Sequence, residues 1–159
     1  MLQLTCRRLT MAGRYQVAMN YKSYRVFVEK KTGFDIQAQQ VLQDLTQNLG
    51  IRGLAGARLL NRYDVTGLSP EEFQQARNLI FSEPMVDVVY DEILPLAKGG
   101  RVFAVEYIPG QYDQRADSAV QCIQFLTQKE RPEVSTAQVV VLAGNISEED
   151  FEKIKNYYI

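Results

Sequence analysis

The side chains that most often carry catalysis are scarce in this chain. Its 159 residues include no histidine, and the two cysteines, Cys6 and Cys122, stand far apart and in no metal-ligand spacing. Without an imidazole the chain cannot assemble a Ser-His or Cys-His nucleophile pair, and it lacks the commonest metal ligand. The patterns G-x-x-x-x-G-K-S/T, G-x-G-x-x-G and H-E-x-x-H are also absent. We therefore expect no catalytic residue, no bound cofactor and no metal site in this chain.

A polar and aromatic cluster at Asn61, Arg62 and Tyr63 is the strongest candidate for a binding surface. Arginine and tyrosine are enriched at protein interfaces, because they combine a large contact area with hydrogen-bonding groups. We take these three residues as a candidate interdomain interface. The alternative is that Tyr63 packs on its own sheet while Arg62 is solvated.

The charged runs of the sequence are explained by the expected strands and helices without a phosphate or metal site. Glu29-Lys30-Lys31 is expected to be the solvated end of a strand rather than a phosphate site. The acidic runs Glu71-Glu72 and Glu148-Glu149-Asp150 stand where two helices are expected to begin. Negative side chains there complement the helix dipole, so these runs need no metal.

Those two helices are expected to begin in the same way. In the first, Ser69 is the N-cap, Pro70 takes the first helical position and Glu72 closes a capping box. In the second, Ser147 is the cap, and Asp150 replaces the boxing glutamate less well. Each start also carries the pair of a hydrophobic staple, Leu68 with Phe73 and Ile146 with Phe151.

The two helix starts belong to a longer internal repeat. Their offset is 147 − 69 = 78, and further upstream an offset of 77 pairs Val28-Glu29 with Val105-Glu106. This period is longer than those of solenoid repeats, so it predicts two copies of a small domain. The offset of 78 also links Asp35 with Asp113, Ala38 with Ala116, Leu42 with Val120, Gln43 with Gln121, and Leu45 with Ile123.

Composition places the chain among ordinary globular proteins, with 46% apolar and 23% charged residues. Its 18 basic and 19 acidic residues leave a net charge of −1, so there is no electrostatic footprint for nucleic acid or anionic lipid. Residues 1–23 contain no apolar run long enough for a signal peptide or a membrane span. Together with the two separated cysteines, this predicts a cytoplasmic protein that binds neither nucleic acid nor membrane.

Periodicity predicts a similar order of elements in both copies. The first copy is predicted as a strand over 24–30, a helix capped by Asp35, a strand over 57–65 bent at Asn61-Arg62 into a short hairpin, a helix over 69–81 and a strand over 85–91. The second is predicted as a strand over 102–107, a helix with apolar positions from Ala116 to Leu126, a strand over 138–143 and a helix after Ser147. No equivalent of the closing strand 85–91 follows.

The predicted organisation is a disordered leader at 1–23, a first repeat at 24–92, a linker at 93–100 and a second repeat at 101–159 without the closing strand. The expected fold class is α+β, with two ferredoxin-like halves, each an antiparallel sheet with helices on one face, arranged as an intrachain pseudo-dimer. Each half alone is marginal in size, so we expect substantial burial between them.

Parts of this sequence resemble the N-terminal domain of phosphoribosylformylglycinamidine synthase of the long single-chain type. The stretches that carry the resemblance are YRVFVEKKTGFD at 24–35, LNRYDV at 60–65 and FSEPMVD at 81–87. The resemblance covers residues 24–159. In that family the domain is a fused, duplicated version of the small PurS subunit of multi-subunit synthases, so the resemblance implies PurS-like halves and an internal repeat.

The resemblance implies part of an ATP- and glutamine-dependent ligase of de novo purine biosynthesis, which converts formylglycinamide ribonucleotide to formylglycinamidine ribonucleotide. ATP, Mg²⁺ and glutamine are implied for the full-length enzyme, whose synthetase core and Cys-His-Glu glutaminase do not fit inside this chain. The implied role of this domain is architectural: it docks the synthetase and glutaminase parts, and alone it is expected to be inactive. No catalytic residue carries over, and a homodimer of the isolated domain is left open.

Two other functions fit the predicted fold. One is a free-standing, metabolite-sensing, ferredoxin-like regulatory module with a ligand shared between the halves. The other is RNA binding, as similar sheets do, but Arg25-Val26-Phe27-Val28 lacks the Gly-aromatic pattern of RNA-binding sheets and no basic face is evident.

Overall fold

The computed structural model describes residues 2–5 and 22–158, and for residues 2–5 it describes the backbone only. Most of residues 1–23, which are predicted as a disordered leader, therefore fall outside the described residues. Its described parts differ from the prediction, because Leu2–Thr5 forms strand β1 and Ser23 begins strand β2. Both segments are held in place by pairing with a neighbouring strand.

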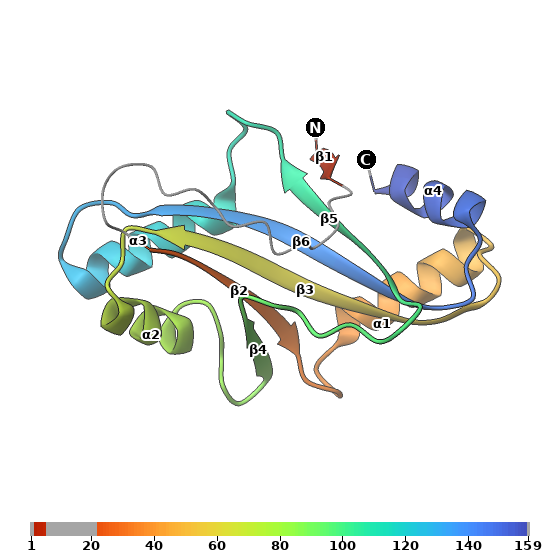
Figure 1. Cartoon of the computed structure of the whole chain (residues 1–159), viewed down its shortest axis with the longest axis horizontal. Coiled ribbons are helices and arrows are strands. Elements are labelled where there is room, and N and C mark those ends of the chain that lie inside the picture. The colour runs from red at the N-terminus through yellow and green to blue at the C-terminus, as the bar shows by residue number, and fades with distance from the viewer. Residues whose placement is uncertain (1, 6–21, 159) are drawn as a thin grey trace.

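The six described strands form one antiparallel sheet in the order β1-β5-β6-β3-β2-β4 (Figure 1). The predicted α+β class is therefore confirmed. None of the described helices is both long and apolar enough to cross a membrane. The strands are β1 (Leu2–Thr5), β2 (Ser23–Lys30), β3 (Leu54–Thr66), β4 (Asp87–Asp91), β5 (Arg101–Tyr107) and β6 (Glu133–Gly144); the helices are α1 (Ile36–Gln43), with its π-helical continuation η1 (Asp44–Asn48), α2 (Pro70–Leu79), α3 (Gln114–Thr127) and α4 (Glu148–Tyr157).

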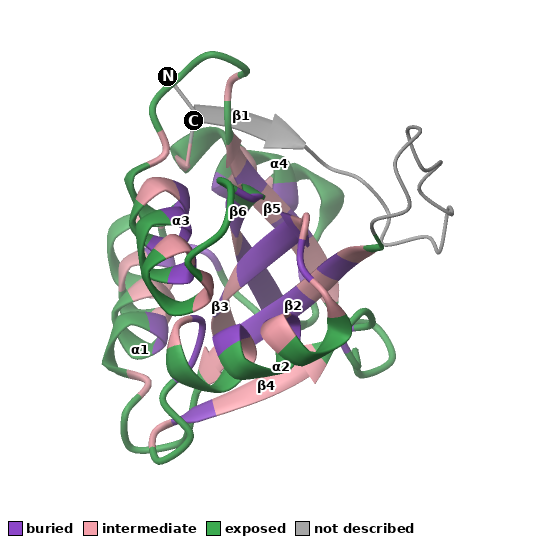
Figure 2. Cartoon of the chain, turned by 90° about the vertical axis from the view of Figure 1, so that its left-hand side faces the viewer, coloured by how far each residue is buried: buried purple, intermediate pink, exposed green. Residues whose placement is uncertain are grey.

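The described α-helices cover one face of the sheet (Figure 2), with α2 and α3 at one end and α1 and α4 at the other (Figure 1). At the first end, Phe73 of α2 and Ile123 of α3 pack with Val26 of β2. At the second end, Leu45 of η1 and Ile154 of α4 pack against β5 and β6. Each core takes one helix from each predicted repeat, so the two repeats share both cores.

The opposite face of the sheet carries a smaller apolar cluster. Phe27, Leu60 and Val139 lie there with Leu94, which is only 5% exposed. Leu94 comes from the segment between β4 and β5, which runs along this face of the sheet in Figure 1. The predicted linker 93–100 therefore contains a residue that is anchored on the sheet.

The strand register shows how the internal repeat is placed. Val28 lies opposite Asn61 in the β2–β3 pair, and Val105 lies opposite Gln138 in the β5–β6 pair, so both strands repeat at 105 − 28 = 77 and 138 − 61 = 77. The helices repeat at 78, since 114 − 36 = 78 and 148 − 70 = 78. The connections between elements absorb the difference of one residue.

Strand β1 occupies the place for which the sequence analysis found no strand in the second repeat. In the first repeat, β4 pairs with β2 so that Val89 lies opposite Val28. In the second, β1 pairs with β5 so that Leu4 lies opposite Val105, the repeat equivalent of Val28. The closing strand of the second repeat is therefore supplied by the N-terminal end of the sequence and not by residues after α4.

The predicted hairpin at Asn61-Arg62 is wrong. Strand β3 runs without a break through these residues and is paired with β2 on one side and β6 on the other. A hairpin bend there would leave backbone groups unpaired on both sides of the strand. The two neighbouring strands therefore keep β3 extended.

Local hydrogen bonds fix the helix ends. The predicted capping box is confirmed, because Ser69 Oγ accepts from the Glu72 N–H at 3.2 Å and a Glu72 carboxylate oxygen accepts from the Ser69 N–H at 3.0 Å. Ser147 Oγ accepts from the Asp150 N–H at 3.1 Å, so this predicted cap is confirmed too. Helix α2 ends at Leu79 rather than near Phe81. The strand predicted from residue 85 begins only at Asp87, because residues 83–87 form a turn with hydrogen bonds to the Glu83 carbonyl.

Asp35 stands at the N-cap position of α1, as predicted, but its side chain does not cap the helix. Its Oδ1 accepts from the Gly33 N–H and from the Gln39 side chain, both at 3.1 Å, and makes no capping hydrogen bond to the helix backbone. Its repeat equivalent, Asp113, does cap α3, by accepting from the Ala116 N–H at 2.9 Å. The same residue type thus serves the preceding turn in one repeat and the helix in the other.

Candidate functional site

The three residues predicted as an interface do not lie on one surface. Successive side chains of a strand point to opposite faces, so Asn61 and Tyr63 lie on the helix face of β3 and Arg62 on the other. Tyr63 is 8% exposed and packs on Phe81, with ring centroids 4.7 Å apart. Its burial matches the alternative in which it packs on its own sheet. An interface role for Asn61, Arg62 and Tyr63 stays a prediction.

Arg62 is buried and ion-paired rather than solvated. It is 9% exposed, and its Nε lies 3.2 Å from Asp64 Oδ2, an ion pair without good hydrogen-bond geometry. Its Nη2 donates to Glu106 of β5, while Arg25 of β2 holds Asp64 at 2.7 Å. This network ties β2, β3 and β5 together, so Arg62 has a structural role.

Two pockets open on the helix face of the sheet, and Tyr63 and Ile80 line both of them. The first has a volume of about 950 Å³ and lies between the start of α1 and the segment that joins α2 to β4. The second has a volume of about 560 Å³ and lies between α3 and the strands β5 and β6. Because they share two lining residues, we treat them as one central groove with two pockets.

The internal repeat relates the two pockets. Asn61 lines the first and Gln138 the second, at the strand offset of 77, and the two residues lie opposite each other in the β3–β6 pair. The approximate axis of the repeat therefore passes between these two amide side chains. Gln37 in the first pocket and Arg115 in the second are related by the helix offset of 78. The cation of the second pocket thus has an uncharged counterpart in the first.

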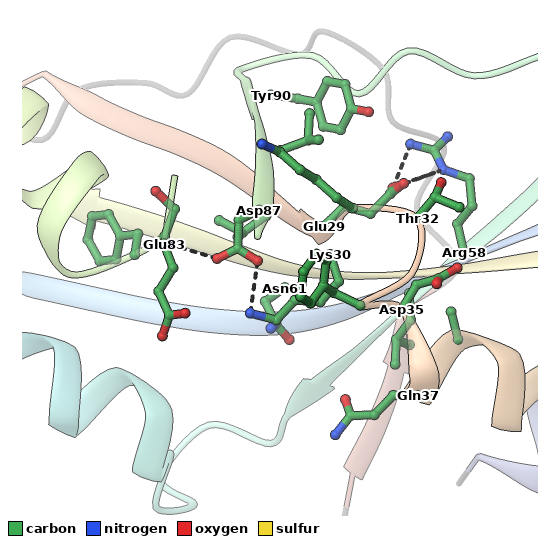
Figure 3. A pocket seen from close by; sticks show the side chains of 18 of the residues that line it. Glu29, Lys30, Thr32, Asp35, Gln37, Arg58, Asn61, Glu83, Asp87 and Tyr90 are labelled. Atoms are coloured by element: carbon green, nitrogen blue, oxygen red, sulfur yellow. Dashed lines mark hydrogen bonds and ion pairs between the residues drawn. The ribbon is translucent and has the colours of Figure 1, made fainter. Parts of the chain in front are cut away.

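The charged groups of the first pocket are largely committed to each other (Figure 3). Lys30 Nζ lies 2.9 Å from Asp87 Oδ1, and Asp87 Oδ2 accepts from the Glu83 N–H at 2.7 Å. Arg58 Nη2 lies 2.7 Å from Glu29 Oε2. Burial acts to lower the pKa of Arg58, but the hydrogen bond and charge of Glu29 outweigh it and raise that pKa. This pocket therefore offers few uncommitted charges to a ligand.

The second pocket has uncommitted donors. Arg115 Nη1 donates to Asn61 Oδ1, and within the described residues the guanidinium has no other partner. The Tyr63 hydroxyl has no hydrogen-bond partner among the described side chains and backbone groups. The Asp113 carboxylate, by contrast, is engaged by the Ala116 N–H and by the Thr136 N–H and hydroxyl, the last at 2.7 Å.

The protonation state of Tyr63 suits a donor role. Burial raises its pKa, Arg115 acts to lower it, and the negative charges of Asp87 and Asp113 raise it further, so that the net shift is upward from 10.0. The phenol is therefore protonated at neutral pH and can donate a hydrogen bond into the groove.

Sequence reasoning missed Arg115 and Gln138 as site residues. Neither belongs to a motif, and each lies at the groove only because the two repeats meet along β3 and β6. The offset of 78 could have indicated Arg115, because it aligns this residue with the uncharged Gln37 on an otherwise similar helix. A charge present in one copy and absent from the other marks where the copies have diverged.

No group of three or more cysteine, aspartate or glutamate side chains within residues 22–158 is arranged to hold a metal ion. The nearest carboxylates to the groove, those of Asp87 and Asp113, are occupied by protein donors. The groove can act chemically by hydrogen bonding and charge, through Arg115, Tyr63 and the central amides.

Comparison of the chain with protein-family models, with curated proteins and with solved structures returned no match. The assignment of a function therefore depends on the sequence pattern and on the geometry described above.

Proposed function

We propose that this chain is the N-terminal, PurS-like domain of a phosphoribosylformylglycinamidine synthase of the long single-chain type. In this proposal it is a non-catalytic architectural domain that docks the synthetase and glutaminase parts of the enzyme. The complete enzyme uses ATP, Mg²⁺ and glutamine to convert formylglycinamide ribonucleotide to formylglycinamidine ribonucleotide. The chain alone has no turnover.

The observation that carries the proposal is the repeat of element positions. A strand-helix-strand-helix order recurs at offsets of 77 and 78, and the two copies meet along the antiparallel β3–β6 pair. β1 and β4 take equivalent places at the two edges of the sheet. This supports two ferredoxin-like halves fused as an intrachain pseudo-dimer, the arrangement that the resemblance implies.

The burial pattern suggests where docking occurs. Arg62 and Tyr63 are buried, whereas Phe34, Ile36 and Met85 are 54%, 62% and 85% exposed. The loops that carry these apolar side chains adjoin, because the Lys31 N–H donates to the Val86 carbonyl at 2.8 Å. Exposed apolar side chains that lie close together mark a protein-binding surface. We assign the contact with the synthetase core to the loops 31–36 and 83–86.

The test is complementation of a synthase that lacks its N-terminal domain. The truncated enzyme and this chain are expressed separately and mixed, and glutamine-dependent formation of the amidine is measured. We expect the chain to restore activity, Phe34→Ser with Ile36→Ser to weaken the complex, and Phe125→Ser, at an 83% exposed position on α3, to leave it unchanged. Failure of the unaltered chain to bind or to restore activity would contradict the proposal.

The alternative of a metabolite-sensing module is favoured by one observation, the central groove at the axis between the repeats. A sensor requires a ligand that contacts both copies, and Asn61 and Gln138 are the groups best placed to do so. The complementation test distinguishes the two functions, because a free-standing sensor neither binds the truncated synthase nor restores its activity.

A further inference from the structure

The central groove contains an arginine that no acidic group within residues 22–158 neutralises. Arg115 is exposed on α3, and its one described partner is the neutral side-chain oxygen of Asn61. By contrast, the strand residues Arg25, Arg58 and Arg62 are each ion-paired. A guanidinium has five N–H donors in a planar fork, so most of the hydrogen-bonding capacity of Arg115 is unused.

A second donor lies beside it in the same pocket. Tyr63 is 92% buried, its phenol is protonated at neutral pH, and its hydroxyl has no partner among the described residues. The charge of Arg115 acts on the pKa of Tyr63, which places the two groups near each other. Only the body of this side chain is buried: its hydroxyl is not among the buried atoms without a partner, so it reaches the open space of the pocket and can donate to a ligand there.

We propose that the pocket between α3, β5 and β6 binds a small organic anion, whose phosphate or carboxylate group accepts hydrogen bonds from Arg115 and Tyr63. Arginine is the side chain best suited to these groups, because its fork matches two oxygens of either anion. The amide of Gln138 and the hydroxyl of Ser118 also line the pocket. Both can donate to the same ligand.

The surroundings are compatible with an anion. Asp113 and Asp87 are the acidic groups that act on Tyr63, but each carboxylate already accepts from protein donors, and Asp87 is also paired with Lys30. The apolar side chains of Ile80, Val105 and Ala119 line the same pocket, so the ligand has an uncharged body as well as an anionic group. The volume of about 560 Å³ is in the range of small-molecule sites.

The other pocket serves as an internal control. At the position equivalent to Arg115 it has Gln37. Of its three cations, Lys30 and Arg58 are paired with carboxylates, and Lys31 donates to the Pro84 carbonyl at 3.1 Å. The repeat therefore builds two similar cavities, of which only the second has an arginine without an ion-pair partner among the described residues. This inference does not depend on the proposed architectural function, since it concerns the isolated chain.

The test is titration of the intact chain with four probes, inorganic phosphate, acetate, phenyl phosphate and benzoate, followed by calorimetry and by amide chemical shifts of α3 and β6. We expect saturable binding, with the phenyl compounds tighter than the bare ions of the same charge type. Tight phosphates with weak carboxylates assign a phosphate ligand, and the converse assigns a carboxylate. Absence of saturable binding by every probe overturns the proposal.

Three variants locate the site. Arg115→Gln copies the first pocket and is expected to weaken binding by about tenfold or more, because it removes charge-assisted hydrogen bonds. Tyr63→Phe keeps the ring and its packing on Phe81, and is expected to weaken binding by about threefold to tenfold. Arg52→Gln removes the same charge from an exposed residue that lines neither pocket, and is expected to have no effect. Equal affinities for Arg115→Gln and the unaltered chain overturn the proposal.

Discussion

Arg62 is the residue whose charge the fold can least easily lose. It is a 9% exposed cation in the middle of β3, between Asp64 and Glu106, and it joins β3 to β5 across the strand β6 that separates them. Removing one member of a buried ionic network leaves the desolvated partners without compensation. The network therefore matters to stability chiefly through the cost of breaking it.

We predict that Arg62→Ala lowers the free energy of unfolding by about 3 kcal/mol. The matched control is Arg77→Ala on α2, where Arg77 pairs with the half-exposed Asp91 at 2.9 Å and the expected loss is about 1 kcal/mol or less. Urea denaturation of both variants measures the difference. Equal losses would show that Arg62 behaves as a surface charge despite its burial.

Tyr158 gives the chain a dependence on alkaline pH. Its ring contacts Phe103, with centroids 5.4 Å apart, and burial, with the nearby Tyr157 and Asp44, raises its pKa from 10.0 to about 12. A group with a raised pKa in the folded state gives its full stabilisation below its unfolded pKa. That stabilisation is lost as the pH rises from 10.0 towards about 12, because the unfolded phenol ionises first.

We predict that Tyr158→Phe flattens the decline of stability between pH 10.0 and about 12, since phenylalanine keeps the ring and has no proton to lose. The measurement is the urea midpoint of both proteins across this range, referred to neutral pH. Tyr63, whose pKa is also raised, contributes a separate part of the decline that the variant retains. Parallel declines in the two proteins would exclude Tyr158 as a source.

At the scale of elements, the second repeat is completed by β1, a strand that lies outside the residues of that repeat in the sequence. It pairs with β5 through residues 2–5, at the edge where β4 pairs with β2 in the first repeat. Without β1, the outer side of β5 would present unpaired N–H and C=O groups. β5 should therefore be the strand most sensitive to the loss of the N-terminal residues.

We predict that deletion of residues 1–21 increases amide hydrogen exchange in β5 by about tenfold or more at those N–H groups that bond to β1, because they lose their acceptors. β2 is the internal control, since its equivalent edge is still covered by β4 and its exchange should stay unchanged. Faster exchange in both strands would indicate global destabilisation. Unchanged exchange in β5 would show that β1 does not protect it.

The elements differ in how well the sequence predicts them. Helix starts are local, so Ser69 with Glu72 and Ser147 with Asp150 were identified as caps from a few adjacent residues. Strand pairing joins residues that are far apart in the sequence, so no short stretch predicts that β1 pairs with β5 or that β3 continues through Asn61. The hairpin prediction failed because it read polar residues as a turn, although both edges of β3 are paired.

The same distinction explains the candidate site. Tyr63 was singled out by its type, and it does line the groove, but Arg115 lies more than fifty residues away in a different repeat. The groove exists only because the two repeats meet over β3 and β6: the start of α1 and the segment from α2 to β4 line its first pocket, and α3 lines its second. Sequence reasoning found the repeat, whereas the site arises from how the copies face each other.

At the scale of the whole molecule, the chain order and the spatial order of the second repeat disagree. In space, β1 closes that repeat beside β5, yet in sequence it precedes the first repeat. β1 pairs with β5, and Tyr158 at the end of α4 packs on Phe103 of β5, so β1 and the end of α4 lie beside the same strand (Figure 1). If the two halves are copies of one fold, a chain in which β1 follows α4 should fold to the same structure, because circular permutation preserves all contacts when the joined ends are near.

We therefore predict that a circular permutant beginning at Lys22 and ending at Tyr21, with a linker after Ile159, keeps the sheet order. Seven residues, 80–86, connect α2 to β4, so a linker of 7 − 3 = 4 residues added to Tyr158, Ile159 and Met1 reproduces that connection between α4 and β1. The free energy of unfolding should stay within about 1 kcal/mol of the parent, since loop-closure entropy changes slowly with length. The control is the chain 22–159, which lacks the linker and residues 1–21. Its free energy of unfolding should be lower than that of the permutant, because the outer edge of β5 is then exposed. If that shorter chain matched the permutant in stability, β1 would not be part of the second half, and the proposed pair of equivalent halves would lose its closing strand.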